Sequence, residues 1–434
     1  MKIEEIINSP IYGYLKLERY VNDGSPSGFS INTTKNDTSP KSKNHFFTLK
    51  VIKFKEKLEY VDVGNKNLVY QPNTMIIHPD MLENKILKKF DYDVIDEINV
   101  APTASGRTVL CLENNHFIKL AYLDYLGRII RHMQLDKIQS ACEVTSQLIK
   151  VAKNPNTNKK FSFLREDAGR VVRIPLNGVE VCEKDKIPQT CLNNNTYEWG
   201  ILFREFKPYP YIDEIEYLIP FFSLFSKEYL PEKNEINVNH ELIIIQLFKK
   251  QTKNIYDFLL EDILFPLFNT YFDALIYGGI ELEAHAQNML ISIGNDYKVK
   301  RIVCRDLESA GRDIDLMKHF NIQYNSSVID YKYNYRKPKN ENQKYDKYTI
   351  THSFMFDFKL GEYIVTPLLN AVKQVYNDLD IELIRMRIKR FNAKFIEKLP
   401  NDFFPSDWCT YDSINFEKTN TERVYIWHDN PKYR

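Results

Sequence analysis

The chain has 434 residues, 43% of them hydrophobic, and its formal net charge is +1. A chain of this length and apolar content can bury a large core, and we expect two or more lobes. A net charge so close to zero gives no long-range attraction to nucleic acid or to an anionic membrane, so any anion must be bound locally.

The first seventy or so residues contain few clear elements. A short helix is predicted from Ile3 to Ile7, followed by a polar linker rich in Ser, Asn and Lys from Asn22 to Asn44. Phe46 to Phe54 has the composition of a β-strand.

The first informative segment is Pro-Thr-Ala-Ser-Gly-Arg-Thr, from Pro102 to Thr108. It places hydroxyls, backbone N–H groups and a forked guanidinium in one turn, and together these groups can bind an anion. Val109 to Leu112 and His116 to Leu120 are predicted to form a hairpin with Lys119 near its mouth. The alternative is that the hydroxyls only cap a turn and that Lys119 is a solvated strand end.

Arg131 stands in an otherwise apolar segment, twelve residues after Lys119. A buried arginine needs an anionic partner, because leaving its charge unpaired costs on the order of 3 to 5 kcal/mol. That partner can be a ligand carboxylate. Apolar residues at helical spacing then predict a helix from about Asp136 to Val151.

The second half of the sequence is mainly helical in pattern. Gly200 to Phe206 is predicted to be a strand that carries Arg204, and the apolar spacing from Leu242 to Tyr277 predicts two helices, or one helix kinked at an internal proline. The polar, aperiodic stretch from Asn321 to Lys347 is expected to be a loop or lid. Two closing helices are predicted, at Ile364 to Asp378 and Ile381 to Leu399.

The most informative stretch is Glu-Ala-His-Ala-Gln-Asn, from Glu283 to Asn288, together with Arg305-Asp306. The apolar runs Met289 to Ile293 and Val299 to Cys304 lie between these two segments and are predicted to pack as a hairpin. The pair Gly278-Gly279 would let the backbone turn out of the preceding helix.

These side chains have the chemistry of a site for a metal ion and a nucleotide. Mg²⁺ prefers hard oxygen ligands and shares them between one or two carboxylates or amides and the phosphates of a substrate. Asn288 and Asp306 meet that need, and His285 could meet a phosphate oxygen. The alternative is a hydrogen-bonded loop end without a ligand.

In this order, the motifs resemble those of the IucA/IucC family, the siderophore synthetases that work independently of non-ribosomal peptide synthetases (NIS synthetases). Pro102 to Thr108 resembles the family's Pro-Thr-x-Ser-x-Arg-Thr loop, and Lys119-Leu120 resembles its Lys-Leu strand. Glu283 to Asn288 with Arg305-Asp306 resembles its Glu-Ala-His-x-Gln-Asn and Arg-Asp motifs. Two further matches are His78-Pro79, at the family's His-Pro-Trp-Gln segment, and Arg131, at its Ile-Arg position.

The resemblance implies an α+β fold with a multi-lobed, cupped-hand architecture around an ATP cleft. A shortened IucA/IucC-like N-terminal region, residues 1–195, would carry the phosphate-binding loop and its hairpin. A largely helical, palm-like (FhuF-like) domain, residues 196–434, would carry the Glu-Ala-His-Ala-Gln-Asn and Arg-Asp motifs. A homodimer is compatible with the resemblance.

The activity implied by the resemblance is amide formation in siderophore biosynthesis. With ATP and Mg²⁺, a citrate-type carboxylate would be adenylated, and an amine, polyamine or hydroxylamine would then displace AMP. Implied ATP-binding residues are Ser105, Arg107, Thr108, Lys119, His285, Gln287, Asn288 and Asp306. Implied substrate-binding residues are Arg131, His78 and Arg204, implied Mg²⁺ ligands are Glu283, Asn288 and Asp306, and implied catalytic residues are Arg131, His285 and Lys119.

The sequence also departs from the family pattern, which leaves other functions open. Asp80 and Met81 stand where the family has Trp and Gln, and the family's upstream N-terminal motif has no counterpart before His78. One alternative is a kinase-like enzyme, since kinases also hold Mg²⁺ with an Asn and an Asp. Another is a non-catalytic relative that binds ATP, a siderophore intermediate or a partner subunit.

The remaining features concern the environment of the chain. Met1 to Glu5 begins a charged turn rather than an apolar leader, and no apolar run approaches the roughly 18 residues that cross a bilayer. We therefore expect a cytoplasmic protein without membrane or nucleic-acid partners. Six cysteines, none in a Cys-x-x-Cys pair, are expected to be reduced core thiols: Cys111, Cys142, Cys182, Cys191, Cys304 and Cys409.

Overall fold

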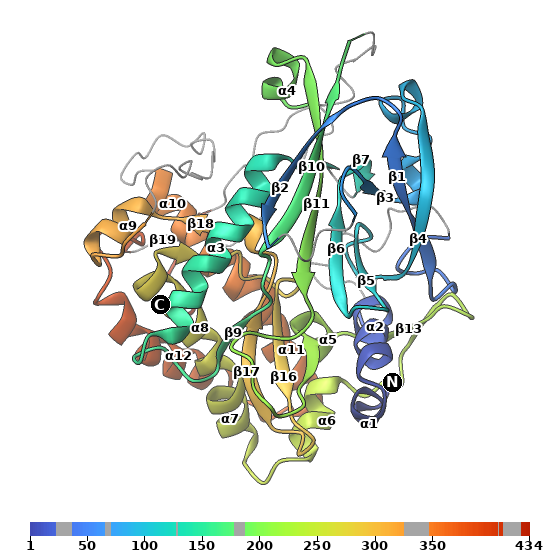
Figure 1. The fold of residues 1–434 in the computed structure, drawn as a ribbon. Helices are drawn as coiled ribbons and strands as arrows, with labels where there is room; N and C mark the ends of the chain where they lie inside the picture. Colours follow the sequence, from blue (N-terminus) through green and yellow to red (C-terminus); the bar gives the residue numbers. More distant parts are fainter. Residues whose placement is uncertain are drawn as a thin grey trace.

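The structure is a computed structural model, and it has the α+β fold class predicted from the sequence. A large antiparallel sheet fills the upper right of Figure 1, and the C-terminal helices gather at the lower left. The structure describes residues 1–22, 37–65, 71–126, 129–177, 187–324, 347–406, 408–410 and 427–434.

The large sheet has eight strands in the order β2-β10-β11-β6-β5-β4-β1-β3, and all neighbours are antiparallel. Apolar side chains such as Val51, Ile118 and Trp199 form the core against one of its faces. The hairpin predicted around the turn at residues 112–115 is confirmed, and its two strands are β5 and β6. The strands are β1 (Phe47–Phe54), β2 (Glu59–Gly64), β3 (Met75–Ile77), β4 (Tyr92–Pro102), β5 (Thr108–Cys111), β6 (His116–Leu120), β10 (Ala168–Pro175) and β11 (Thr196–Glu205).

A second sheet has four strands in the order β12-β16-β17-β9. Its central hairpin, β16 and β17, has the bounds predicted from the two apolar runs. All five residues of β16 are buried, so this strand is covered on both faces and reads as continuously apolar. The strands are β9 (Phe161–Phe163), β12 (Tyr217–Pro220), β16 (Met289–Ile293) and β17 (Val299–Cys304).

Smaller elements lie outside the two sheets. Two-stranded pairs are β7 (Tyr122–Leu126) with β8 (Ile129–Arg131), β13 (Glu228–Leu230) with β14 (Glu235–Asn237), β15 (Ile280–Glu281) with β18 (Gly311–Arg312), and β19 (Trp408–Thr410) with β20 (Trp427–Asp429). The 3-10 helices are η3 (Pro79–Met81), η4 (Leu87–Lys89) and η7 (Leu307–Ser309).

Helix α3 crosses the centre of the molecule, between the large sheet and the helical side (Figure 1), and confirms the helix predicted there. The α-helices are α1 (Ile3–Asn8), α2 (Pro10–Tyr20), α3 (Leu135–Lys153), α4 (Gln189–Asn193), α5 (Phe221–Phe225), α6 (Ile243–Lys249), α7 (Ile255–Asp257), α8 (Phe265–Gly278), α9 (Ile314–His319), α10 (Lys347–Ser353), α11 (Thr366–Val375) and α12 (Ile381–Ile396). Two π-helices are η6 (Phe258–Leu264) and η8 (Phe354–Val365).

The two helices predicted between 242 and 277 are confirmed, but the break between them falls at residues 250–254 and not at the proline. The first helix is α6, and the second runs without a break through α7, η6 and α8. Pro266 lies where η6 runs directly into α8, so its missing N–H leaves one hydrogen bond of this continuous helix unmade. Gly279 ends α8 with a left-handed backbone, φ 60°, so the turn predicted at the glycine pair is confirmed.

Two predictions about helices need correction. The N-terminal region holds a second helix, α2, that was not predicted. The closing helical region begins at Lys347 with α10 and η8, before the predicted start at Ile364. Most of the predicted loop or lid, residues 325–346, lies outside the described residues.

The two sheets are interleaved along the sequence. Strand β11 lies after residue 195 but pairs with β10 and β6 inside the large sheet. Strand β9 lies before residue 195 but belongs to the second sheet, beside β17. The division into regions 1–195 and 196–434 stays a prediction.

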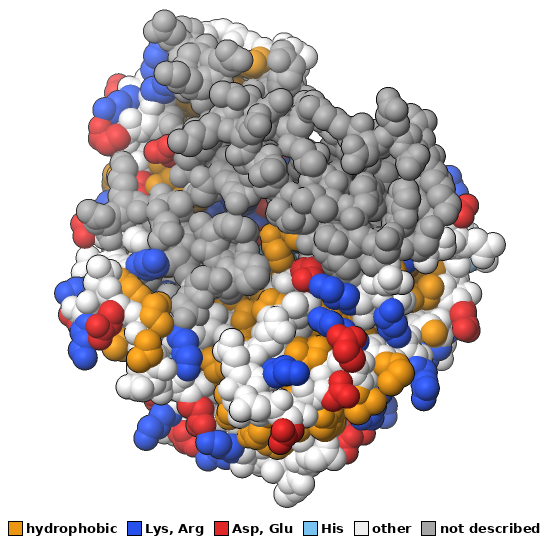
Figure 2. Space-filling view, turned by 180° about the vertical axis from the view of Figure 1, so that it is seen from behind, with side chains coloured by type: hydrophobic (Ala, Val, Ile, Leu, Met, Phe, Trp, Pro, Cys, Tyr) orange, Lys and Arg blue, Asp and Glu red, His pale blue; other side chains and the backbone are white. Residues whose placement is uncertain are grey.

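The surface carries both signs of charge. On the face shown in Figure 2, basic and acidic side chains are interspersed over the part that the structure describes. In the described segments, every helix is too short or too polar to span a bilayer. Cys111, Cys142, Cys191 and Cys304 are free thiols, as predicted, while the side chains of Cys182 and Cys409 are not described.

Candidate functional site

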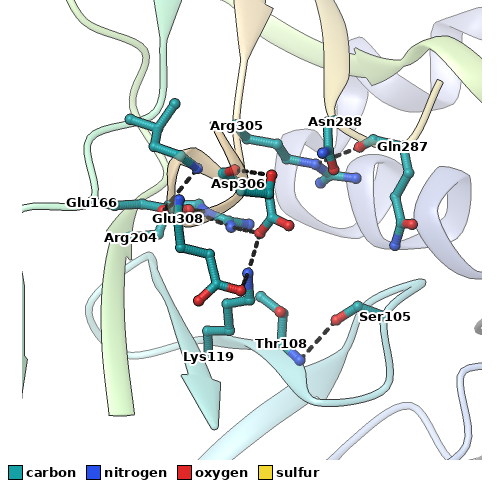
Figure 3. Close-up of polar contacts among 12 residues, drawn as sticks. Ser105, Thr108, Lys119, Glu166, Arg204, Gln287, Asn288, Arg305, Asp306 and Glu308 are labelled. Atoms are coloured by element: carbon teal, nitrogen blue, oxygen red, sulfur yellow. Dashed lines mark hydrogen bonds and ion pairs between the residues drawn. The ribbon is translucent and has the colours of Figure 1, made fainter. Parts of the chain in front are cut away.

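Two distant segments of the chain meet at Lys119. The side chain of Lys119 leaves β6 and its ammonium contacts the carboxylate of Asp306, 187 positions away, just after β17 (Figure 3). The same ammonium lies 2.8 Å from Glu308 Oε1. Lys119 is only 3% exposed, so these carboxylates compensate its charge. The structure therefore brings the predicted phosphate-binding hairpin and the predicted Mg²⁺ segment together.

Arg107 reaches the same carboxylate from the turn before β5. Its guanidinium lies 3.2 Å from Glu308 Oε1 and donates to the carbonyl oxygens of Leu120, at 3.3 Å, and Arg131, at 3.4 Å. Burial acts to raise the pKa of Glu308, but Lys119 and Arg107 outweigh it and hold that pKa below its usual range. Glu308 was not predicted from the sequence.

We call Lys119, Arg107, Arg204, Asp306 and Glu308 the Lys119 cluster. Asp306 is its more exposed carboxylate, with a side chain that is 27% exposed. Its Oδ1 accepts from Lys119 and from the guanidinium of Arg204, at 2.6 Å. Burial acts to raise the pKa of Asp306, but these two cations dominate and lower it strongly. The Asp306 carboxylate is therefore ionised at neutral pH.

Glu166 holds the first residues of η7 through hydrogen bonds to their backbone N–H groups. Its Oε1 accepts from Arg204 Nε at 2.5 Å, and its Oε2 accepts the backbone N–H groups of Leu307, at 2.9 Å, and Glu308, at 3.3 Å. The Glu166 carboxylate is fully buried, and this burial raises its pKa. Because Arg204 is held by Glu166 and Asp306, its predicted contact with a substrate stays a prediction.

The turn from Thr103 to Thr108 is closed by its own hydroxyls. Thr103 Oγ1 donates to the carbonyl oxygen of Thr108 at 2.6 Å, and Ser105 Oγ accepts the N–H of Thr108 at 2.9 Å. Gly106 has φ 71°, a conformation that favours glycine. The hydroxyls thus cap the turn, as the alternative expectation had it, and the Ser105 hydroxyl hydrogen remains to be donated to another acceptor.

The Glu283 to Asn288 segment is also rigidly held. His285 Nδ1 accepts the N–H of Gln287 at 3.2 Å, which places the imidazole proton on Nε2. Burial lowers the pKa of His285 to about 4, so the ring is neutral at pH 7. Asn288 Nδ2 donates to the carbonyl oxygen of Glu283 at 3.1 Å, and the Glu283 carboxylate pairs with Lys359 of η8 at 3.2 Å.

Helix α2 ties these segments together. The Glu18 carboxylate contacts the Arg305 guanidinium, and its Oε2 accepts the N–H of Ala104 at 3.2 Å. Arg305 also donates to Tyr14 Oη at 2.6 Å and to the carbonyl oxygen of Gln287 at 2.8 Å. Glu18 and Tyr14 were not predicted, because their partners are remote in sequence.

In sequence, the chain matches no protein-family model and no curated protein. Solved structures do match it. The petrobactin biosynthesis protein AsbB from Bacillus anthracis superposes with a TM-score of 0.65 at 16% identity, over 97% of this chain and 75% of AsbB. The aerobactin synthetases IucA and IucC from a hypervirulent Klebsiella pneumoniae both superpose with a TM-score of 0.57 at 13% identity.

This chain has the fold of the aerobactin synthetases. The superposition covers 89% of this chain and 69% of IucA, and 84% of this chain and 65% of IucC. An ATP-bound structure of IucA is among these matches. The resemblance to the IucA/IucC family predicted from the motifs is therefore confirmed at the level of the fold.

On this synthetase fold, Arg131 lies beside the cluster without joining it. Its side chain is half-buried and makes no hydrogen bond or ion pair within the described residues. Burial, and then the charge of Arg107, lower its pKa. A guanidinium in this position can bind a carboxylate from outside the chain.

His78 lies elsewhere on the synthetase fold, in the core of the large sheet. It is 1% exposed, and its ring centroid lies 5.2 Å from that of Phe47 and 5.1 Å from that of Tyr122. Its Nδ1 accepts the N–H of Asp80 at 3.2 Å. These described contacts differ from those of the Lys119 cluster, so the predicted substrate contact of His78 stays a prediction.

The carboxylates of the site can hold Mg²⁺ only if a bound ligand contributes further oxygens. Within the part of the chain that the structure describes, no three His, Cys, Asp or Glu side chains are arranged to hold a metal ion. Mg²⁺ usually takes one or two carboxylates together with water and phosphates. Asp306 has a half-buried carboxylate, and Glu308 has a buried Oε2 without a hydrogen-bond partner among the described residues, so both fit this need.

Proposed function

We propose that the chain is a member of the IucA/IucC family and acts as an ATP-dependent ligase in siderophore biosynthesis. Its substrates would be a citrate-type carboxylate and an amine, polyamine or hydroxylamine, and its product an amide. The observation that carries this proposal is the contact of Lys119 with Asp306 and Glu308. It joins the two motif segments on a fold shared with an ATP-bound synthetase.

The charge of the cluster supports a nucleotide bound with a divalent cation. Lys119, Arg107 and Arg204 are each compensated by a protein carboxylate. Because the site is close to electrical balance, a triphosphate would bring excess negative charge unless a cation came with it. Mg²⁺ would supply that positive charge, held by Asp306 together with Asn288 or Glu283.

The proposed reaction has two steps. A carboxylate oxygen of the acid attacks the α-phosphorus of ATP, pyrophosphate leaves, and an acyl adenylate forms. The amine nitrogen then attacks the acyl carbon, loses a proton, and displaces AMP. Each step brings two anions together or develops charge on oxygen, so fixed cations and N–H donors lower its barrier.

The proposed roles follow from the positions of the side chains. Lys119 and Arg107 would contact phosphate oxygens in place of Glu308, aided by Ser105, Thr108 and Gln287. His285 would donate its Nε2 proton in a hydrogen bond to a phosphate or acyl oxygen, since the ring is neutral. Arg131 would bind the carboxylate of the acid. We place the enzyme in the cytoplasm, where ATP is available.

A product screen tests this proposal. Purified protein would be given ATP, Mg²⁺ and citrate, succinate or 2-oxoglutarate with a panel of di- and polyamines, and pyrophosphate release and hydroxylamine trapping would be measured. We expect pyrophosphate release that depends on one acid, and none from Asp306→Asn. Formation of ADP would favour the kinase-like alternative, and equal, background rates in both proteins would favour a non-catalytic relative.

A further inference from the structure

Glu308 has one carboxylate oxygen that lacks a hydrogen-bond partner among the described residues. Glu308 is 8% exposed, its Oε1 forms ion pairs with both Lys119 and Arg107, and its Oε2 is buried without a hydrogen-bond partner among the described residues. Buried carboxylate oxygens in proteins are nearly always paired. An orphaned oxygen beside a cation site indicates that a further cation or donor belongs there.

Glu308 occupies the position that a phosphate oxygen would take. A single oxygen, Oε1, lies 2.8 Å from the ammonium of Lys119 and 3.2 Å from the guanidinium of Arg107. Figure 3 shows the side chains of Glu308 in η7, Asp306 just before η7, and Lys119 in β6 pointing toward one another. A phosphate oxygen that took this position would displace Glu308 from both cations.

The loss of both cations would leave a buried, uncompensated carboxylate, which is strongly unfavourable. Asp306 would lose Lys119 in the same event but would keep Arg204. The group that can restore the balance is a divalent cation that arrives with the phosphates, because it carries two charges and prefers carboxylate oxygens.

On the basis of the proposed function, we infer that Glu308 exchanges Lys119 and Arg107 for a divalent cation when nucleotide binds. The backbone of η7 can stay in place during this exchange, because Glu166 Oε2 accepts the N–H groups of Leu307 and Glu308. Only side-chain torsions of Glu308 need to change. Glu308 and Asp306 then form the carboxylate part of the metal site.

The experiment compares ATP binding with and without Mg²⁺, by calorimetry, in the wild-type protein and in Glu308→Gln. In Glu308→Gln, ATP without Mg²⁺ binds at least as tightly as in the wild type, because the competing carboxylate charge is gone. The gain in affinity on adding Mg²⁺ falls by roughly tenfold or more. Mn²⁺ bound with ATP, detected by electron paramagnetic resonance, weakens in parallel.

The matched control is Glu143→Gln. Glu143 pairs with Arg312 of β18, and this ion pair lies outside the Lys119 cluster. Glu143→Gln therefore removes one carboxylate charge, as Glu308→Gln does, but at a different place. It keeps the wild-type gain from Mg²⁺. Glu308→Asp, which retains the carboxylate on a shorter side chain, recovers part of the gain and serves as the test if the Gln variant does not fold.

Two outcomes are distinguishable. If the wild type binds ATP and Mg²⁺ strengthens binding equally in Glu308→Gln, the assignment of Glu308 is wrong while the proposed function stands. The assignment is also wrong if Glu308→Asp and Glu308→Gln both keep the full Mn²⁺ signal. If the wild type binds no ATP under either condition, the proposed function fails, and the role of Glu308 fails with it.

Discussion

Glu18 of α2 and Arg305, just after β17, form a buried ion pair across 287 positions of the chain. Their side chains are 1% and 5% exposed. The other Glu18 oxygen accepts the N–H of Ala104 in the turn that leads to Arg107. One carboxylate on the N-terminal helix therefore fixes the spacing between the two halves of the candidate site.

Glu18→Gln tests this role. We expect the free energy of unfolding to fall by about 3 kcal/mol, because Arg305 loses its buried counter-charge. We also expect the KM for ATP to rise, since the two halves would no longer be held at one spacing. Urea unfolding and steady-state kinetics measure these effects, with Glu5→Gln, an exposed partner of Lys16, as the control. A lower stability with an unchanged KM for ATP would show that Glu18 is only structural.

Lys119→Ala is expected to abolish ATP-dependent turnover while the protein stays folded. Folding should survive because Asp306 keeps Arg204 and Glu308 keeps Arg107 as counter-charges. Pyrophosphate release and circular dichroism provide the measurements. Lys50→Ala removes a lysine from β1 of the same sheet, where Lys50 pairs with Glu97, and should retain full activity. Normal turnover in Lys119→Ala would remove the nucleotide assignment.

Arg131→Ala is expected to act on the acid substrate alone. A charge-assisted hydrogen bond contributes about 1.5 to 3 kcal/mol, so the KM for the acid should rise by roughly tenfold to a hundredfold. The stability should hardly change, because the Arg131 side chain makes no bond within the described residues. Acid titrations at saturating ATP test this, and unchanged KM and kcat would contradict it.

We expect His352 to make the stability of the protein depend on pH. Its Nδ1 lies 2.7 Å from Glu281 and its Nε2 lies 3.2 Å from Asp313. Burial acts to lower the pKa of His352, but these two carboxylates outweigh it and raise the pKa to about 9. Since the folded-state pKa lies above the unfolded value of about 6.5, the stabilisation is complete below that pH and is lost as the pH rises through 9.

We therefore expect the free energy of unfolding to fall by up to about 3 kcal/mol between pH 6 and pH 10 through this one residue. In His352→Gln this dependence should be absent, so the difference between the two proteins shrinks at high pH. Urea unfolding at several pH values measures it. Parallel stability profiles for the two proteins would show that His352 does not titrate in this range.

Local patterns predicted the hairpins well. Strands β16 and β17 have the predicted bounds, because each is a short apolar run between turn residues. Helix α3 was found from its apolar spacing. Helix α2 was missed because its buried face includes Gly13, Glu18 and Arg19, which weakens any apolar period. The π-helix η8 was missed because most of its residues are buried and no polar face marks it.

The contacts that assemble the candidate site were beyond local patterns. Glu308 meets Arg107 across 201 positions, and Glu166 meets Leu307 across 141. Neither glutamate lies in a motif that predicts its partner. The sequence predicted which segments carry the chemistry, but the carboxylates that hold those segments follow only from the tertiary packing.

Asp306 has φ 69° and ψ 52°, in the left-handed region that Gly, Asn and Asp adopt most easily. Alanine there would add backbone strain, on the order of 1 kcal/mol, to the loss of the carboxylate. Asparagine keeps the conformation and removes only the charge, so Asp306→Asn isolates the role of the carboxylate. In a saturation library at this position, folded proteins should therefore be enriched in Asn and Gly and depleted of Val, Ile and Thr, whatever their activity.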